Sequence, residues 1–403
     1  MKKIYLLIYL ALISVAASSQ WNVMPSGTTR ALYSVHFPSA NTGYVVGAKD
    51  ASTGIILKTT DAGTTWTTLM STTTNWILSG YFTDTNTGYA VGALILKTTD
   101  GGLTWNNQYS GTPVILLSVY FINNDVGYVV GQWGVILKTV NGGTSWTTLS
   151  SGTTEDLHSV YFVNLDTGYA VGGDQFFSTG VILKTIDGGI TWSSISKSYC
   201  LNSVYFPNSN IGYAVGERIL KTINGGTTWT ENGTSSLLNS VYFTDDTTGY
   251  AVGIRYYSNY NVGTIIKTID GGNTWIDDSS GTSNELKSIY FTSKDTGYTV
   301  GTNGTILKTS DGGIEFIRES KSSNNRFIIY PNPANQKITV SEKYITSQEI
   351  KVTILNFIGE QILYYKFTKQ NSMELDVSSL TKGVYLIKIQ TKTGIEVQKL
   401  VIQ

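Results

Sequence analysis

The sequence has little of several residue types, and each scarcity excludes a class of protein. Cys200 is the only cysteine among 403 residues, so the chain cannot form an internal disulfide. Charged residues make up 14% and the formal net charge is zero, whereas a nucleic-acid-binding protein carries a clustered basic face. No run beyond the N-terminus is apolar enough to cross a bilayer, so we expect no transmembrane helix in the mature chain.

Cys200 also has no catalytic partner nearby in the sequence. His158, one of two histidines, lies a whole repeat before it. A thiol becomes nucleophilic when a neighbouring group lowers its pKa. We therefore interpret Cys200 as a half-buried small apolar residue. Nothing in the sequence requires a cofactor.

Proline is rare, at six residues, while glycine (42 residues) and aromatic residues (12%) are abundant. No long helical periodicity appears, so the composition predicts an all-β protein. One phrase, typified by ILKTIDGGITW (182–192), occurs seven times. Its copies end at Trp66, Trp105, Trp146, Trp192, Trp229, Trp275 and, in degraded form, Phe316.

The centre of each phrase is a turn, which we call the DGG turn. Its acidic or amide side chain can accept backbone N–H groups, and its glycines take positive φ without strain. The seven acceptors are Asp61, Asp100, Asn141, Asp187, Asn224, Asp270 and Asp311. Two of them are asparagines, which keep the acceptor and lose the charge that a calcium site needs. We therefore expect structural turns and no metal.

A second phrase, SVYF…GYAVG, alternates with the first. Its GY pairs begin at Gly43, Gly88, Gly127, Gly168, Gly212, Gly249 and Gly297, with spacings of 37 to 48 residues. Repeats of that length with four short strands predict propeller blades. In the third repeat the expected strands are 116–121, 127–131, 135–139 and 146–149. We therefore predict a seven-bladed β-propeller.

The N-terminus of the mature chain is expected to close the ring. Residues 21–37 match residues 146–162 position for position, so Trp21 stands where a fourth strand begins. The seventh phrase lacks its tryptophan. The residues from Trp21 to Val23 should therefore form the outer strand of blade seven and protect a sheet edge.

Strand alternation predicts two faces with different roles. The DGG turns, between strands three and four, lie on one side; loops between strands two and three and between blades lie on the other, the loop face. The aromatic and charged residues expected there are Trp133, Phe176, Phe177, Glu217, Arg218, Arg255, Tyr256, Tyr257 and Tyr260. They suit a protein or glycan contact surface, or else they pack on one another.

The chain divides in sequence into four parts. Residues 1–19 read as a signal peptide, because two lysines precede a short apolar run and small residues. Residues 20–319 form the propeller, 320–326 a polar linker and 327–403 a small β-sandwich of about seven strands.

The repeat K-T-x-[DN]-G-G-x-T-W with GYAVG resembles the BNR/Asp-box repeats of photosystem II stability/assembly factor-like propellers. The resemblance implies a non-enzymatic ring that binds a partner on one face. Asp-box propellers also include sialidases, which hold a carboxylate with three arginines, so a secreted glycoside hydrolase is the alternative. The residues available for it are Arg30, Arg218, Arg255, Glu155, Asp156, Asp174 and Glu217.

The C-terminal part resembles the C-terminal sorting domain of the type IX (Por) secretion system. The resemblance rests on the segments YPNPA (330–334), GVYLIKI (383–389) and KLV (399–401). The residues that carry it are Pro331, Asn332, Pro333, Gly383, Tyr385, Lys388 and Lys399. It implies recognition by type IX machinery and delivery to the surface or medium of a Gram-negative bacterium. We expect an exported, monomeric binding scaffold without catalytic residues.

Overall fold

The structure is a computed structural model. It describes residues 21–49, 53–70, 76–174, 176, 178–234, 236–258, 260–313, 326–342, 349–356, 361–368, 370, 372–391 and 394–403. The expected signal peptide, residues 320–325 of the expected linker, Phe177 and Phe316 lie outside these ranges. The chain divides into two compact units, one spanning Ser18–Ile314 and one containing Glu315–Gln403. Among the described residues, no helix is long and apolar enough to span a membrane.

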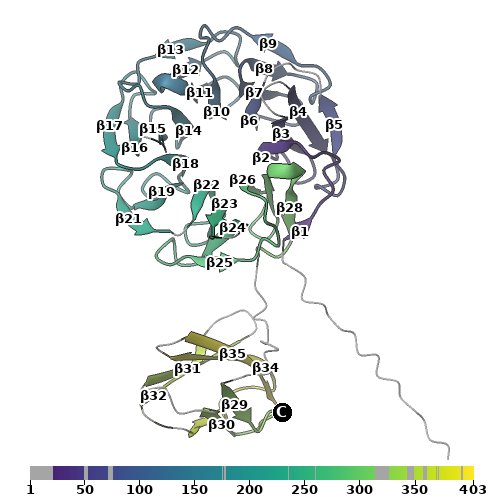
Figure 1. Ribbon diagram of the computed structural model, residues 1–403, viewed down its shortest axis with the longest axis vertical. Helices are drawn as coiled ribbons and strands as arrows, with labels where there is room; N and C mark the ends of the chain where they lie inside the picture. Colours follow the sequence, from purple (N-terminus) through teal and green to yellow (C-terminus); the bar gives the residue numbers. More distant parts are fainter. Residues whose placement is uncertain are drawn as a thin grey trace, which may run out of the picture. The chain divides into compact units, whose positions relative to one another are not determined.

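The first unit is a ring of four-stranded antiparallel sheets (Figure 1). Blades one to three are β2 (Ala31–His36), β3 (Gly43–Lys49), β4 (Thr53–Thr59), β5 (Thr67–Met70); β6 (Ile77–Phe82), β7 (Gly88–Gly92), β8 (Ile95–Thr98), β9 (Asn106–Gln108); and β10 (Leu116–Phe121), β11 (Gly127–Gly131), β12 (Ile136–Thr139), β13 (Thr147–Leu149). Blades four and five are β14 (Leu157–Phe162), β15 (Gly168–Asp174), β16 (Thr179–Thr185), β17 (Ser193–Lys197); and β18 (Leu201–Tyr205), β19 (Gly212–Gly216), β20 (Arg218–Thr222), β21 (Thr230–Gly233). Blades six and seven are β22 (Leu237–Phe243), β23 (Gly249–Tyr256), β24 (Asn261–Thr268), β25 (Ile276–Asp278); and β26 (Leu286–Phe291), β27 (Gly297–Gly301), β28 (Ile306–Thr309) with β1 (Asn22–Val23).

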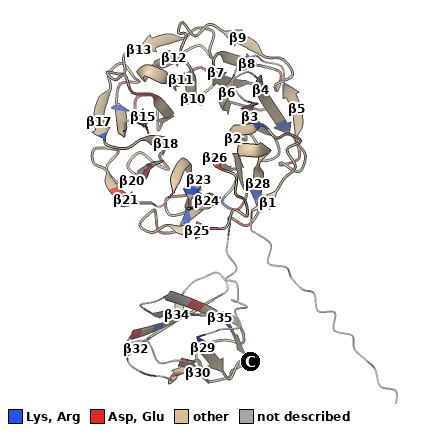
Figure 2. Cartoon of the chain, viewed as in Figure 1, with Lys and Arg blue, Asp and Glu red and all other residues tan. Residues whose placement is uncertain are grey.

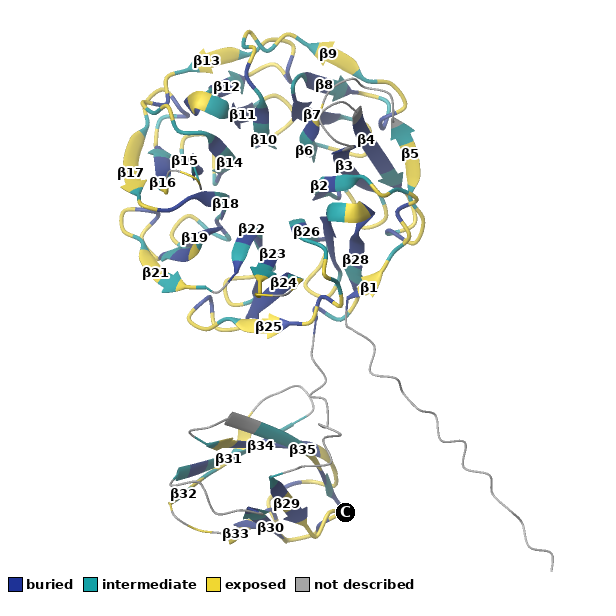
Figure 3. Ribbon diagram, viewed as in Figure 1, coloured by how far each residue is buried: buried dark blue, intermediate teal, exposed yellow. Residues whose placement is uncertain are grey.

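The all-β propeller prediction is confirmed, and the described residues form seven such sheets in the ring. The first strand of each blade lines the centre and the fourth lies at the rim (Figure 1). The second and third strands are almost entirely buried, while the outer strands are largely exposed (Figure 3). Short 3₁₀ turns follow the second strand in blades three (η1, Gln132–Gly134) and seven (η2, Thr302–Gly304).

The N-terminal strand closes the ring as the sequence predicts. β1 pairs with β28 through Asn22↔Lys308 and Val23↔Leu307, and this completes blade seven. Trp21 is only 1% exposed and meets the ring of Phe291 edge to face at 6.1 Å. Its indole Nε1 donates to Asp278 Oδ2 at 2.9 Å. The residues that lead into blade one therefore complete blade seven by strand pairing, and Trp21 packs at its boundary with blade six.

Every boundary between blades uses one aromatic arrangement. The tyrosine of each GY pair stacks on the phenylalanine that ends, or directly follows, the first strand of the next blade, as Tyr128 does on Phe162 at 3.8 Å. The tryptophan of that next blade meets the same phenylalanine edge to face, as Trp192 does at 6.1 Å. Stacked and edge-to-face pairs of this kind add to the gain from area burial. Trp21 takes the tryptophan position at the Phe291 boundary.

The same tyrosines bind the DGG turns of the neighbouring blade. Tyr128 Oη donates to Gly188 O at 2.8 Å, and Lys138 Nζ donates to the same carbonyl at 2.8 Å. All seven blades repeat the tyrosine bond, at 2.6–3.1 Å. Burial of the ring raises the pKa of Tyr169 and Tyr213 to about 12. Each DGG turn is therefore a joint between two blades.

Two closed belts run around the centre of the ring. In one, each SVYF serine accepts a backbone N–H from the next blade, at 3.2–3.4 Å around the ring. In the other, seven aromatic rings follow one another with centroids 4.5–5.4 Å apart. Six are tyrosines and the seventh is His36, whose burial lowers its pKa to about 4.

The second unit contains two sheets. Its strands are β29 (Phe327–Tyr330), β30 (Lys337–Glu342), β31 (Glu349–Leu355), β32 (Gln361–Thr368), β33 (Ser372–Asp376), β34 (Gly383–Thr391) and β35 (Gly394–Ile402). They pair in the orders β29-β30-β33 and β32-β31-β34-β35. Val340 and Leu375 of one sheet share a buried apolar cluster with Val352 and Ile387 of the other. The two sheets therefore pack face to face.

Candidate functional site

The DGG turns use their carboxylates within the turn itself. Asp187 Oδ1 accepts the backbone N–H of Thr191 at 2.9 Å, and its Oδ2 accepts the hydroxyl of Thr191 at 2.6 Å. Thr185 Oγ1 donates to Asp187 Oδ1 at 2.8 Å. The Thr191 hydroxyl is the largest cause that lowers the pKa of Asp187 to about 2. Asp61 and Asp100 have the same arrangement and the same lowered pKa.

The asparagine turns keep this geometry without a charge. Asn141 Oδ1 accepts the backbone N–H of Ser145 at 3.0 Å, and its Nδ2 donates to Ser145 Oγ at 2.9 Å. Asn224 repeats both contacts with Thr228. Within the part of the chain that the structure describes, no group of three or more His, Cys, Asp or Glu residues could hold a metal ion. The remaining acceptors, Asp270 and Asp311, accept hydroxyls of Thr268 and Thr309 in the same way.

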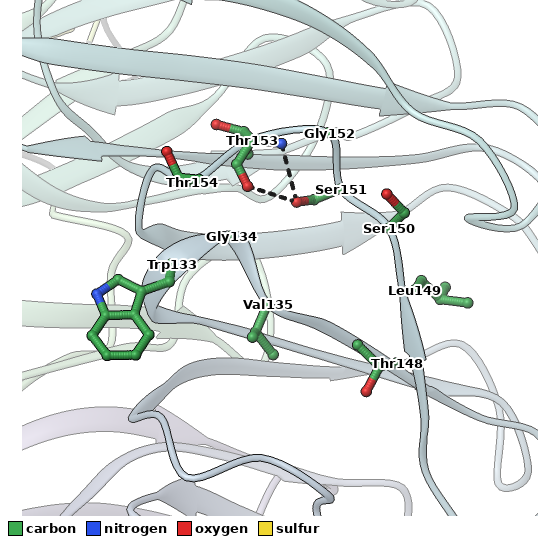
Figure 4. Close-up of a pocket in the computed structure, with 10 residues that line it drawn as sticks. All are labelled: Trp133, Gly134, Val135, Thr148, Leu149, Ser150, Ser151, Gly152, Thr153 and Thr154. Carbon is green, nitrogen blue, oxygen red and sulfur yellow. Dashed lines mark hydrogen bonds between the residues drawn. The ribbon is translucent and has the colours of Figure 1, made fainter.

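The loop face carries Trp133 beside a groove of about 630 Å³ (Figure 4). Trp133 is the middle residue of η1, has φ 57° and ψ 32°, and is 70% exposed. Its backbone N–H donates to Asp156 Oδ1 at 2.9 Å. Gly134 lies so close to Thr153 that a Cβ there would be 2.1 Å from the Thr153 carbonyl oxygen. The turn and the linker to blade four therefore hold each other in place.

Blades four and five place the next set of predicted residues. Phe176 is 95% exposed, and its backbone N–H donates to Asp174 Oδ1 at 2.7 Å. Glu217 Oε1 accepts the backbone N–H of Cys200 at 3.2 Å. The Arg218 guanidinium lies 6.0 Å from the ring of Tyr199. Phe176 thus projects into solvent, whereas Glu217 and Arg218 are engaged with their own blade.

Blade six extends β23 and β24 into a hairpin that carries three tyrosines. Tyr256, Tyr257 and Tyr260 are 61%, 44% and 61% exposed. Tyr257 and Tyr260 stack at 4.7 Å, so the prediction of mutual packing holds for these two rings. Arg255 forms two hydrogen bonds with Asp277 and one with Ser236. Its guanidinium therefore binds its own blade.

The carboxylates that a hydrolase could use form hydrogen bonds within the loops. Asp156 and Asp174 accept backbone N–H groups, and Glu155 Oε2 accepts the hydroxyl of Thr179 at 2.6 Å. The expected arginines lie in blades one, five and six, and Arg30 donates to Gly54 O. Arg30 and Arg218 donate to backbone carbonyl groups and Arg255 donates to Asp277, so the three arginines do not share a partner. Charged residues are scattered over a ring that is mostly uncharged (Figure 2).

Cys200 does have a histidine beside it, which the sequence argument failed to find. His158 Nδ1 lies 3.6 Å from Cys200 Sγ, because the first strands of blades four and five are neighbours. The thiol is nevertheless fully buried, and burial with nearby Glu217, Asp174, Glu155 and Asp156 raises its pKa to about 12. A protonated buried thiol is not a nucleophile, so the interpretation of Cys200 as a small apolar residue stands, but the residue is fully buried where the sequence suggested half-burial.

The sequence argument also passed over two features of the ring. A groove of about 850 Å³ at the junction of blades seven and one is built like the Trp133 groove, with Asn303 in place of the tryptophan. On the side of the DGG turns, several apolar residues are 51–75% exposed: Leu103, Val140, Leu165, Ile186, Ile190, Ile223 and Ile269. Comparison of equivalent positions between repeats would have found both.

In the second unit the three segments that define the tail come together at its last strand. Asn332 Nδ2 donates to Lys399 O at 2.6 Å, and Asn332 Oδ1 accepts the N–H of Val401 at 2.9 Å. Pro331 and Pro333 flank this asparagine. β34 pairs with β35 through Gly383↔Ile402, Tyr385↔Leu400 and Lys388↔Val397. The Tyr385 hydroxyl donates to Thr381 O at 2.9 Å.

Family comparisons agree with both resemblances. A model of the secretion system C-terminal sorting domain matches residues 328–403. A model of the photosynthesis system II assembly factor YCF48 matches residues 66–154. A search of curated proteins gave no match. The chain therefore carries a sorting domain and propeller repeats similar to those of YCF48.

Solved structures show the same fold. YCF48 bound to D1 peptide is 19% identical, with a TM-score of 0.59, over 73% of this chain and 96% of that one. YCF48 from Cyanidioschyzon merolae is 21% identical, with a TM-score of 0.57, over 72% and 98%. PorZ, an essential bacterial surface component of the type-IX secretion system of Porphyromonas gingivalis, is 10% identical, with a TM-score of 0.55, over 92% of this chain and 59% of that one.

Proposed function

We propose that this protein is an exported, non-enzymatic binding scaffold whose partner, a protein or a glycan, docks on the loop face. One contrast carries the proposal. All seven tyrosine bonds to the DGG turns serve to join blades. On the loop face, Trp133, Phe176, Tyr256 and Tyr260 are 61–95% exposed. Exposed aromatic side chains on a rigid frame are the usual anchors of binding surfaces.

The tail supports export. Its match to a sorting domain, with the apolar N-terminus expected to act as a signal peptide, favours two-step passage to the surface or medium through type IX machinery. The test is a fusion of residues 321–403 to a neutral reporter in a bacterium with that machinery. We expect the reporter outside the cell, and we expect a fusion lacking β35 to remain in the periplasm. A periplasmic full-length fusion would contradict the sorting role.

A protein partner has support from a related fold. YCF48, which shares this ring, has been solved with a peptide bound. The zero net charge and the scattered charged residues do not favour nucleic acid. The candidate carboxylates and arginines are held by contacts within the loops and their own blades, as Glu155 is by Thr179 and Arg255 by Asp277, and this favours binding over hydrolysis. We therefore assign no catalytic residue.

The proposal is tested by capture of partners on the mature, full-length chain. Replacing Tyr256 and Tyr260 with alanine should lower partner binding at least ten-fold, since exposed aromatic anchors dominate such surfaces. Ile186→Ala with Ile190→Ala is the matched control, because these side chains are 70% and 74% exposed on the opposite side. Loss of binding in the control alone would place the partner on the wrong face for this proposal.

A further inference from the structure

Trp133 has a conformation and an exposure that the fold does not explain. Its φ of 57° lies in the left-handed region, which bulky residues rarely occupy. Its side chain is 70% exposed, and within the described residues its indole N–H has no hydrogen-bond partner. Strained residues of this kind persist where they serve a function.

Blade seven shows that the turn itself does not need a tryptophan. Asn303 occupies the equivalent place in η2, with φ 55° and ψ 34°, and is followed by Gly304 as Trp133 is by Gly134. Asparagine visits this region at low cost because its short side chain bonds locally. Asn303 Nδ2 donates to Asn284 Oδ1 at 2.8 Å. The same backbone therefore forms around a residue that suits it better.

The groove beside Trp133 is polar but uncharged. Thr148, Ser150 and Thr154 present exposed hydroxyls, while Ser151 is bonded within its own turn to Thr153. None of the ten lining residues is charged. The indole stands at one end and Leu149 and Ser150 at the other (Figure 4). A volume of about 630 Å³ falls within the range of small-ligand sites, roughly 300–1,000 Å³.

We propose that this groove binds a neutral oligosaccharide, with one sugar ring lying against the face of Trp133. A pyranose presents an apolar C–H face and a rim of hydroxyls. The indole matches the first and the threonine and serine hydroxyls match the second. The inference rests on the proposed function, because it places a glycan ligand at one position of the loop face.

The groove suits an anionic ligand or a peptide strand less well than a neutral sugar. A phosphate or a carboxylate would require a cationic group, and the groove lining has none. A peptide strand could pair with the outer strand β13, but that pairing would use its backbone and would not need the indole. The proposal therefore predicts that binding depends on Trp133 and changes little with salt, since screening acts on charges.

The test uses the mature chain and Trp133→Asn, which installs the residue of the equivalent turn. Probes are neutral hexasaccharides of glucose, mannose, galactose and N-acetylglucosamine, measured by calorimetry at low and high salt. We expect at least one to bind, with a Kd that Trp133→Asn raises at least ten-fold and that salt changes less than about two-fold. We expect the variant to melt no lower than the parent, because Asn relieves the left-handed strain.

Ile223→Ala is the matched control, since it removes a side chain that is 70% exposed on the side of the DGG turns and outside the groove, and it should leave sugar binding unchanged. A parent that binds no sugar, or binding that survives Trp133→Asn, overturns the assignment. A peptide array that requires Trp133 while the sugars fail assigns the groove to a peptide and also overturns it. Sugar binding lost only in the Tyr256 and Tyr260 variant would retain the loop face and reject the groove. A variant that melts several degrees lower makes Trp133 structural and rejects the proposal.

Discussion

Removal of the residues that close the ring should destabilise it more than any equivalent change at the surface. Trp21 is 1% exposed, packs on Phe291 and donates to Asp278. Replacing a buried tryptophan with alanine costs about 3–5 kcal/mol. At about 2 °C per kcal/mol for a unit of this size, Trp21→Ala should lower the melting temperature by about 8 °C.

Deletion of residues 21–25 should have a larger effect than Trp21→Ala. It also removes the pairing of β1 with β28 and the bond from Met24 N to Ile306 O at 2.8 Å. β28 then becomes an unpaired edge, which is a template for association with a second chain. We therefore expect concentration-dependent oligomers, whereas the parent should be a monomer.

The assays are thermal unfolding by circular dichroism and sedimentation of the mature chain. Val23→Ala is the control, because Val23 belongs to β1, the strand that Trp21 precedes, but is 72% exposed, and it should shift the melting temperature by less than about 1 °C. An unchanged melt with monomeric protein after the deletion would refute the closure argument. A Val23→Ala shift as large as that of Trp21→Ala would refute the role given to the indole.

Three further predictions concern the repeated positions. His36→Tyr, which installs the residue of the other six blades, should improve stability between about pH 6.5 and 4. Burial lowers the folded pKa of His36 to about 4, so the parent loses stability as the pH falls through this window. Thermal melts at a series of pH values measure the difference between parent and variant. Asp187→Asn should melt like the parent at pH 7 and lose less stability than the parent between about pH 4 and 2. The lowered folded pKa of Asp187, about 2, gives stability that is present above the unfolded pKa and lost on acidification, and the variant lacks this contribution while Asp61 and Asp100 keep theirs. Tyr213→Phe removes the 2.7 Å bond to Gly271 and should lower unfolding free energy by about 1–2 kcal/mol in urea titrations, whereas Tyr260→Phe should be neutral.

The ring could be predicted from the sequence because the strands and turns of each repeat are determined by residues within that repeat. In blade three the expected strands 116–121 and 127–131 are observed unchanged. The expected strands 135–139 and 146–149 each begin one residue later, at Ile136 and Thr147. The error at Trp146 has a reason: the tryptophan still belongs to the turn, and its ring packs on Phe121 before the strand begins.

The candidate site was harder to predict, because it depends on contacts between blades. The partner of Cys200 is His158, 42 residues earlier, and only the neighbouring first strands bring them together. The hydrolase alternative needs arginines that face one another, yet Arg255 is bound by Asp277 on its own outer strand. The left-handed backbone of Trp133 is also absent from any local pattern, since tryptophan does not favour it. Local sequence rules cannot supply these facts.

The contacts between blades explain why variation collects on the loop face. On the other side, each DGG carbonyl accepts the tyrosine of the preceding blade, so a change in that turn breaks a joint. In the part of the chain that the structure describes, the loops between the second and third strands carry no tyrosine bond to the next blade. Blade three has Trp133 there, blade six a tyrosine hairpin, and blade five only Glu217 before β20 begins. These loops can therefore change in length and chemistry while the joints that hold the ring remain. Folding constrains a binding surface least where no tyrosine bond to a neighbouring blade has to be preserved, and the exposed aromatic residues of the ring lie on that face.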